Sequence, residues 1–183
     1  MRYFMRSAGM RVSLVLISLS LLTGIAGAQQ VQTVSMGKYI SSCLYNFSRY
    51  IDWPADKKSG DFIITIVGSK DVYNQLTALT QNMKVGLQSI QVKYASSVND
   101  LSGFQHIIFI NDLQSSKINA VLQRIADSGT LLVTETEGMI TRGSMINFIP
   151  VDGMMKFEIS QENLKKNKLM ASVILQKMAV NIN

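Results

Sequence analysis

The chain has 183 residues, a formal net charge of +6 and a single cysteine. Arg2, Arg6 and Arg11 belong to a predicted signal segment, and without it 15 basic residues face 12 acidic ones, a net charge of +3. A charge this small, with no basic cluster denser than Lys165 to Lys168, argues against a nucleic-acid-binding protein. Because Cys43 is alone, no intramolecular disulfide can form.

Residues 1–28 are predicted to be a cleaved signal peptide. Three arginines precede the apolar run Val12–Leu22, and the small residues Ala26-Gly27-Ala28 precede the expected cut before Gln29. An uncleaved membrane anchor is the alternative, but the run is shorter than the roughly 20 residues that span a bilayer. The 155 residues from 29 to 183 fit one domain with a single core.

Periodic apolar residues predict alternating helices and strands along that domain. The first helix begins at Ser35 with a spacing of three and four, and Trp53-Pro54 ends it. Cys43 is expected on its apolar face as a buried side chain, with an intermolecular bridge as the alternative. Ser115 or Ser116 is expected to cap a later helix that Ser128-Gly129 ends. The predicted strands are 62–67, 87–94, 106–110 and 130–134, with helices after the first and the third.

The stretch 138–160 predicts a half-buried β-hairpin. Ile146 and Phe148 share one face, while Asn147 points the other way, and residues 150–153 separate the two strands. Ser160 is expected to cap a final helix that runs to Ala179 with a bend near Asn167. The fold class is therefore α/β, a single three-layer domain whose mostly parallel sheet is extended by antiparallel edge strands from the hairpin and closed by a helix.

The sequence offers no convincing catalytic or metal-binding pattern. Gly68 stands alone where a dinucleotide fingerprint needs three glycines. His106 is the only histidine and opens a buried strand, so we expect a satisfied ring rather than a metal ligand or a catalytic base. We predict no cofactor, no metal site and no enzymatic activity.

Two loop segments carry weaker candidates. Glu135 and Glu137 could perform acid–base chemistry if the loops brought them together, but solvated loop charges are the favoured interpretation. Arg142, followed by Gly143-Ser144, could present a cation and backbone amides to an anion, or it could simply lie in the turn before the hairpin.

The first helix and its exit are rich in aromatic residues, namely Tyr45, Phe47, Tyr50 and Trp53. We expect most of them in the core, while a protein interface is the alternative. Tyr50, Trp53 and Arg142 are the residues that we predict to bind a partner.

Several of these segments together resemble the YfiR-like family of periplasmic proteins. They are Tyr50 to Pro54, the strand 62–67 before Gly68, the runs HIIFI and TLLVT, Gly143 to Phe148 and Met155 to Ser160. The resemblance covers residues 39–179. It implies a periplasmic regulator that is not an enzyme, tends to dimerise and represses an inner-membrane diguanylate cyclase by binding its periplasmic sensor part.

That resemblance also implies control of cyclic di-GMP and hence of biofilm formation or motility. The disulfides of the family's namesake cannot form here, because Cys43 is the only cysteine. An alternative hypothesis is a periplasmic module that binds a small ligand at the strand ends 68–71, 111–112 and 135–138. A hydrolase that uses Glu135 or Glu137 ranks third.

Overall fold

The computed structural model describes residues 35–182, so the predicted signal peptide lies outside the described residues. These residues belong to one compact unit. Its centre is a seven-stranded sheet with the order β3-β4-β2-β5-β6-β7-β8. The pairs from β4 to β7 are parallel, and the outermost pair at each edge is antiparallel. The α/β fold class predicted from the sequence is confirmed.

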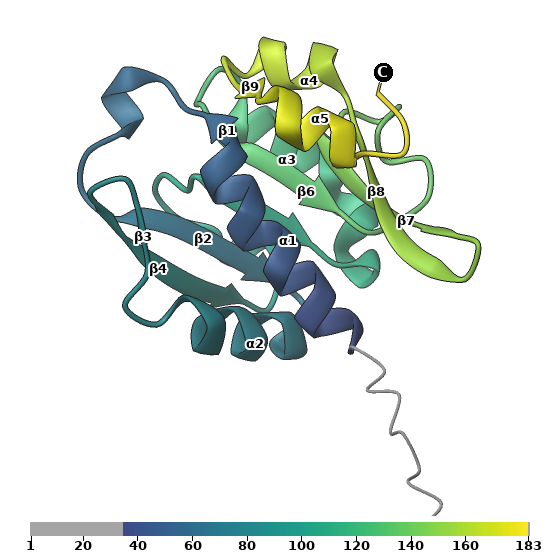
Figure 1. The fold of residues 1–183 in the computed structure, drawn as a ribbon, viewed down its shortest axis with the longest axis horizontal. Helices are drawn as coiled ribbons and strands as arrows, with labels where there is room; N and C mark the ends of the chain where they lie inside the picture. Colours follow the sequence, from purple (N-terminus) through teal and green to yellow (C-terminus); the bar gives the residue numbers. More distant parts are fainter. Residues whose placement is uncertain (1–34, 183) are drawn as a thin grey trace, which may run out of the picture. The chain divides into compact units, whose positions relative to one another are not determined.

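The strands and helices follow the predicted alternation (Figure 1). The sheet strands are β2 (Phe62–Val67), β3 (Lys84–Val85), β4 (Gln88–Ala95), β5 (Ile107–Ile110), β6 (Leu131–Thr134), β7 (Ile146–Val151) and β8 (Met154–Ile159). The α-helices are α1 (Met36–Tyr50), α2 (Lys70–Thr80), α3 (Ile118–Ile125), α4 (Gln161–Lys166) and α5 (Val173–Met178). A separate pair joins β1 (Ile51–Asp52) to β9 (Met170–Ala171).

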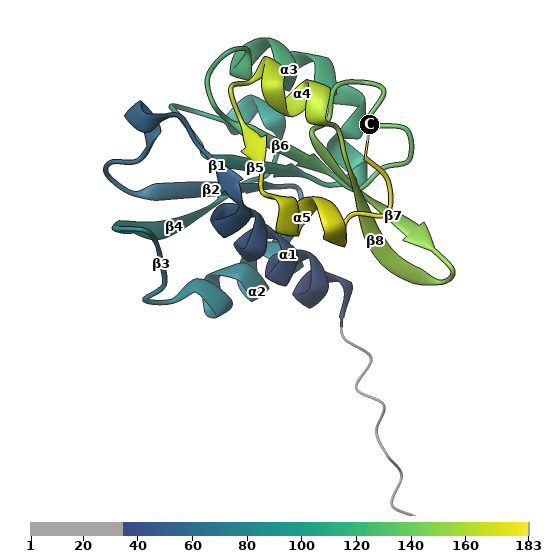
Figure 2. The ribbon, with the colours of Figure 1, turned by 45° about the horizontal axis from the view of Figure 1, so that its top comes forward.

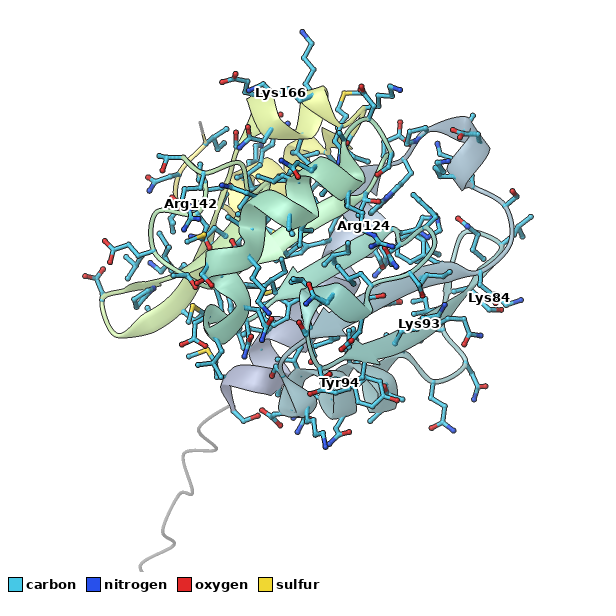
Figure 3. The ribbon with its side chains drawn as sticks, turned by 180° about the vertical axis from the view of Figure 1, so that it is seen from behind. Lys84, Lys93, Tyr94, Arg124, Arg142 and Lys166 are labelled. Atoms are coloured by element: carbon cyan, nitrogen blue, oxygen red, sulfur yellow. The ribbon has the colours of Figure 1, made fainter. Side chains whose placement is uncertain are left out.

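Helices cover both faces of the sheet, which gives three layers. α1, α2 and α5 lie on one face, and α3 lies on the other (Figures 1 and 3). β5 and β6 are buried along their whole length, as expected for parallel strands that are covered on both faces. Apolar side chains from α1 pack onto the sheet, and Phe47 stacks on Phe148 with ring centroids 5.9 Å apart.

The hairpin after residue 138 forms, and its second strand alternates as predicted, with Phe157 and Ile159 buried and Lys156 and Glu158 more exposed. Its first strand differs from the prediction, because Ile146, Asn147 and Phe148 are all buried. β7 pairs in parallel with β6 on one side and antiparallel with β8 on the other, so of the two hairpin strands β8 alone lies at an edge of the sheet. Asn147, expected on a polar face, is fully buried. Its carboxamide accepts a hydrogen bond from Thr134 at 2.7 Å and donates one to Glu158 at 3.0 Å. These partners explain how a polar residue enters a covered strand.

The prediction of one helix from Ser160 to Ala179 is wrong, because two short helices, α4 and α5, occupy this range with β9 between them. Ser160 caps α4 as expected, because its hydroxyl accepts from the amide of Asn163. The helix then ends, Lys168 adopts a positive φ of 59°, and β9 pairs with β1 before α5 begins. The buried Asn167 donates to the carbonyl of Thr130 at 2.6 Å, which holds the chain at the break.

Two smaller expectations also fail. Neither Ser115 nor Ser116 caps α3, because a 3₁₀-helix at Asp112–Lys117 runs directly into it and the residue before α3 is Lys117. Leu87 is not part of a strand. It lies with Gly86 in the two-residue turn between β3 and β4, where its side chain is 94% exposed.

The C-terminal segment continues along the free edge of β8. The amide of Val180 donates to the carbonyl of Phe157, and the amide of Ile159 donates to the carbonyl of Asn181, both at 3.0 Å. Ile182 forms an isolated parallel bridge to Ile159. The segment therefore pairs with half of an edge that would otherwise offer unpaired backbone groups to another chain.

Candidate functional site

The structure places the three predicted partner-binding residues in different surroundings. The side chain of Trp53 is 5% exposed and belongs to the core. Tyr50 is half-buried at the end of α1, and its carbonyl accepts from the amide of Ser172 at 2.8 Å, just before α5. Arg142 is exposed in the turn between β6 and β7, on the side that Figure 3 shows. Their role in binding stays a prediction, and for Trp53 the packing favours the core interpretation.

Several large apolar side chains are exposed in and around β9 and α5. Met170 in β9 is 63% exposed, and Val173 and Ile174 at the start of α5 are 65% and 57% exposed. Larger apolar side chains in a contiguous exposed group are a mark of interaction sites. β9, α5 and the C-terminal segment follow one another on the α1 side of the domain (Figures 1 and 2). We call this the C-terminal surface, formed by Met170, Val173, Ile174, Met178, Val180 and Ile182.

A groove with a basic rim adjoins the C-terminal surface. It has a volume of about 790 Å³ and lies between the segment after β1 and the segment from α4 to β9. Lys58, Lys165 and Lys168 line it, with Asp52 as its one carboxylate, and Met170 belongs to both the groove and the surface. Lys58 pairs with Asp52 at 2.7 Å. Lys168 lies 3.9 Å from Asp127, so Lys165 is the one lining lysine without an ion pair among the described residues. Three lysines against one carboxylate still leave the lining with a net positive charge, which suits an acidic segment of a partner.

Sequence reasoning missed the C-terminal surface because it placed residues 170–179 in the final helix predicted to run from Ser160 to Ala179, without asking which apolar side chains of that helix stay exposed. Within α5 only Leu175 is buried, and the adjacent residue Ile174 is exposed. One signal was available in the sequence. The run of apolar residues from Met170 to Val180 is too dense for a single face of a helix.

The only histidine has a structural role. The amide of Ile63 donates to Nδ1 of His106 at 3.0 Å, and Nε2 donates to the carbonyl of Lys57 at 2.8 Å. The ring stacks on Phe62 with centroids 4.2 Å apart. Burial lowers the pKa of His106 below 6.5, so the neutral tautomer that makes both hydrogen bonds persists near neutral pH. The predicted satisfied ring is confirmed.

Cys43 is buried and free, as predicted. Burial raises the pKa of its thiol to about 11, and burial together with the neighbouring Cys43 raises the pKa of Tyr39 to about 12. A thiol that stays protonated inside the core is a poor nucleophile. The position therefore favours packing over the intermolecular bridge.

The two candidate carboxylates differ from each other. Glu137 is exposed in solvent, as expected. Glu135 is partly buried, accepts a hydrogen bond from the amide of Asp112 at 3.3 Å, and has a pKa raised to about 7, chiefly by burial and also by the charge of Asp112. The prediction of a solvated charge is therefore wrong for Glu135.

Replacing Glu135 with glutamine is expected to change how stability depends on pH. The folded state of the parent binds more protons than the unfolded state between pH 4.5 and about 7, so this group lowers stability as pH rises through that window. His106 acts oppositely below pH 6.5, because its folded pKa is lowered. The free energy of unfolding of Glu135→Gln should therefore rise with pH more steeply than that of the parent. The two slopes should differ by at most about 1.4 kcal/mol per pH unit.

Urea unfolding of the parent and of Glu135→Gln at several pH values between about 5 and 8 measures this difference. Glu137→Gln is the control, and its profile should match that of the parent because Glu137 is exposed. Identical profiles for Glu135→Gln and the parent would show that Glu135 does not titrate in this range.

Residues 35–182 hold neither a metal-binding group of the usual ligand types nor a helix that could span a membrane. No group of three or more histidine, cysteine, aspartate and glutamate side chains in this part of the chain is arranged to hold a metal ion. No helix among these residues has the length and hydropathy needed to cross a bilayer.

Comparison with known proteins gives one result that covers most of the chain. A family model described as YfiR/HmsC-like matches residues 38–180, from the first turns of α1 to the C-terminal segment. A search of curated proteins finds no match. Because the matched range spans all seven sheet strands and both flanking helical layers, the chain belongs to the YfiR/HmsC-like family.

Proposed function

We propose that this protein is an exported regulator that binds the periplasmic sensor part of an inner-membrane signalling protein through the C-terminal surface. The partner is a diguanylate cyclase that the bound regulator represses. Family membership supports regulation of this kind, since the YfiR-like family is regulatory rather than catalytic and is linked to diguanylate cyclase signalling. The predicted signal peptide supports export to the periplasm.

The C-terminal surface is the observation that carries the proposal. Its exposed apolar side chains adjoin a groove that is lined by three lysines, Lys58, Lys165 and Lys168, and by one carboxylate, Asp52. An apolar centre with a charged rim is the usual anatomy of a protein interface. The complementary partner surface has apolar side chains beside carboxylates. Tyr50 contributes here through its position next to α5, whereas Arg142 would mark a separate contact.

Replacing Ile174 with aspartate is expected to weaken partner binding about tenfold or more, since a charge would enter the apolar centre of the interface. Stability should change by less than about 0.5 kcal/mol, because the side chain is exposed. Recovery of a membrane protein by crosslinking in cells, with the parent and the variant as baits, measures the loss.

Leu87→Asp is the matched control. Among residues 35–182, Leu87 is the most exposed of the large apolar residues, and its turn lies at the opposite edge of the sheet from β8. The control should recover the same partner as the parent. Equal recovery by Ile174→Asp and the parent would exclude the C-terminal surface, and Lys165→Glu and Arg142→Glu would then test the groove and the β6–β7 turn.

The cellular level of cyclic di-GMP tests whether the protein represses a diguanylate cyclase. Deleting the gene should raise its level, and restoring the parent gene should reverse the rise. Restoration with Ile174→Asp should fail, whereas Leu87→Asp should succeed. An unchanged level after deletion would reject repression of a cyclase, while the crosslinking result would still report whether a membrane partner exists.

A further inference from the structure

A cavity of about 310 Å³ lies between α3 and α4, which are neighbours in Figure 2. Its apolar walls are side chains of Leu122, Ile125, Ala126 and Met145. Its polar lining consists of Asp127, Asn163, Lys166 and Asn167. The strand ends 68–71, 111–112 and 135–138 contribute nothing to this lining. The cavity is therefore separate from the place where parallel sheets usually bind ligands.

The two asparagines present their carboxamides in a fixed orientation. They are four residues apart, so their side chains lie on the same side of α4. Nδ2 of Asn163 donates to the carbonyls of Ile140 and Ser144, at 3.1 and 2.8 Å. Nδ2 of Asn167 donates to the carbonyl of Thr130 at 2.6 Å. Because a carbonyl oxygen can only accept, these contacts decide which end of each carboxamide carries the nitrogen.

The oxygens of both carboxamides are open acceptors. No residue from 35 to 182 donates a hydrogen bond to Oδ1 of Asn163 or of Asn167. Five side-chain polar atoms in this range are sealed from solvent without a partner, and neither oxygen is one of them. Asn167 is only 3% exposed, so the open space that its oxygen reaches is the cavity that it lines. A mostly buried acceptor in this position needs a donor from within the cavity.

The charges at the cavity favour a donor that is also a cation. Asp127 adds a carboxylate to the lining, and its contact with Lys168 is long, at 3.9 Å. Lys166 pairs at 2.7 Å with Glu162, which does not line the cavity. An ammonium group has three N–H donors and no acceptor. These donors match the two carboxamide oxygens and the carboxylate of the lining.

We propose that this cavity binds a small organic amine, a molecule with a protonated amino group and an apolar body. The amino group donates to Oδ1 of Asn163 and Asn167 and faces the carboxylate of Asp127. The apolar body packs on Leu122 and Ile125 of α3. The inference does not depend on the partner proposed above, because no residue of the C-terminal surface lines the cavity.

Titration of the chain from Gln29 onward with 2-phenylethylamine tests the site, with calorimetry and the thermal unfolding midpoint as readouts. One molecule per chain should bind with a dissociation constant on the order of 10⁻³ M, the strength expected for a ligand of roughly nine non-hydrogen atoms. The unfolding midpoint should rise saturably with the amine. 3-Phenylpropionate has a similar apolar body but a carboxylate that only accepts, so it should bind about tenfold more weakly or worse.

Two variants locate the bound amine without removing a hydrogen bond described above. Ala126→Leu fills part of the cavity and should weaken binding about tenfold or more, whereas Ala78→Leu, the same change at an exposed position of α2, should bind like the parent. Asp127→Asn removes the negative charge and should weaken binding about threefold or more. Asparagine tolerates the positive φ of 56° at this position, so the turn is preserved.

Three results would overturn the inference. The first is no saturable heat or midpoint shift at about ten times the expected dissociation constant. The second is equal binding of 2-phenylethylamine and 3-phenylpropionate, which would show that the apolar body alone is recognised. The third is parent-like binding by both Ala126→Leu and Asp127→Asn, which would place the amine elsewhere on the protein.

Discussion

Replacing Trp53 with alanine is expected to lower the free energy of unfolding by about 3–5 kcal/mol. The Trp53 ring packs edge-on against Phe62 with centroids 5.0 Å apart, and it also lies 6.2 Å from the ring of His106. Alanine would leave a cavity among these rings. Because Cys43 is free, no disulfide restrains the domain when that packing is lost. The urea midpoint of the variant, compared with that of the parent, measures the loss.

Trp53→Phe is the control for packing. Phenylalanine retains an aromatic ring and removes Nε1, a buried donor without a partner, so we expect roughly half the loss or less. A different outcome would revive the interface interpretation. If Trp53→Ala unfolds at the same urea concentration as the parent and yet loses the crosslinked partner, the side chain acts in binding and not in the core.

The central strands could be predicted because burial on both faces leaves a direct record in the sequence. β5 and β6 read as continuous apolar runs and are buried throughout. Which strands lie beside β5 and β6 in the sheet could not be predicted in the same way. The order of strands depends on which side each crossover takes, and no local pattern of residues records that choice.

Asn147 shows why the sequence predicted a first hairpin strand that is less buried than the observed β7. The alternation of apolar and polar side chains at Ile146, Asn147 and Phe148 is typical of a strand with one solvent-exposed face. Asn147 is instead buried because Thr134 and Glu158, distant in sequence, satisfy its carboxamide. Similarly, β9 forms only because β1 pairs with it, so its two residues looked like part of a helix.

Some features of the candidate sites could be predicted from the sequence, and others could not. The satisfied ring of His106 followed from its place at the start of a buried strand, and the burial of Cys43 followed from its helical face. The C-terminal surface could not be assigned, because periodicity identifies an apolar face and does not show whether another element covers it. The environment of Glu135 was also beyond sequence patterns, since the loop after β5 creates it.

Replacing Gly68 with alanine is expected to cost about 2–5 kcal/mol, the sum of two effects. Gly68 has a φ of +83°, which costs an L-residue about 1–2 kcal/mol. A Cβ there would also collide with the carboxamide of Asn111, and overpacking of this kind costs about 1–3 kcal/mol. Asn111 is 6% exposed, so it has little room to move away. Urea unfolding of the variant and the parent measures the loss.

Two further variants separate the backbone effect from the collision. Gly86→Ala should cost only about 1–2 kcal/mol, because Gly86 has a φ of +58° and nothing lies within 4 Å of a Cβ there. Asn111→Ala removes the obstructing carboxamide, so the double variant Gly68→Ala with Asn111→Ala should lose less stability than the two single losses added together. The difference should fall within the roughly 0.5–3 kcal/mol typical of residues in contact. Strictly additive losses would show that the backbone conformation alone requires glycine at position 68.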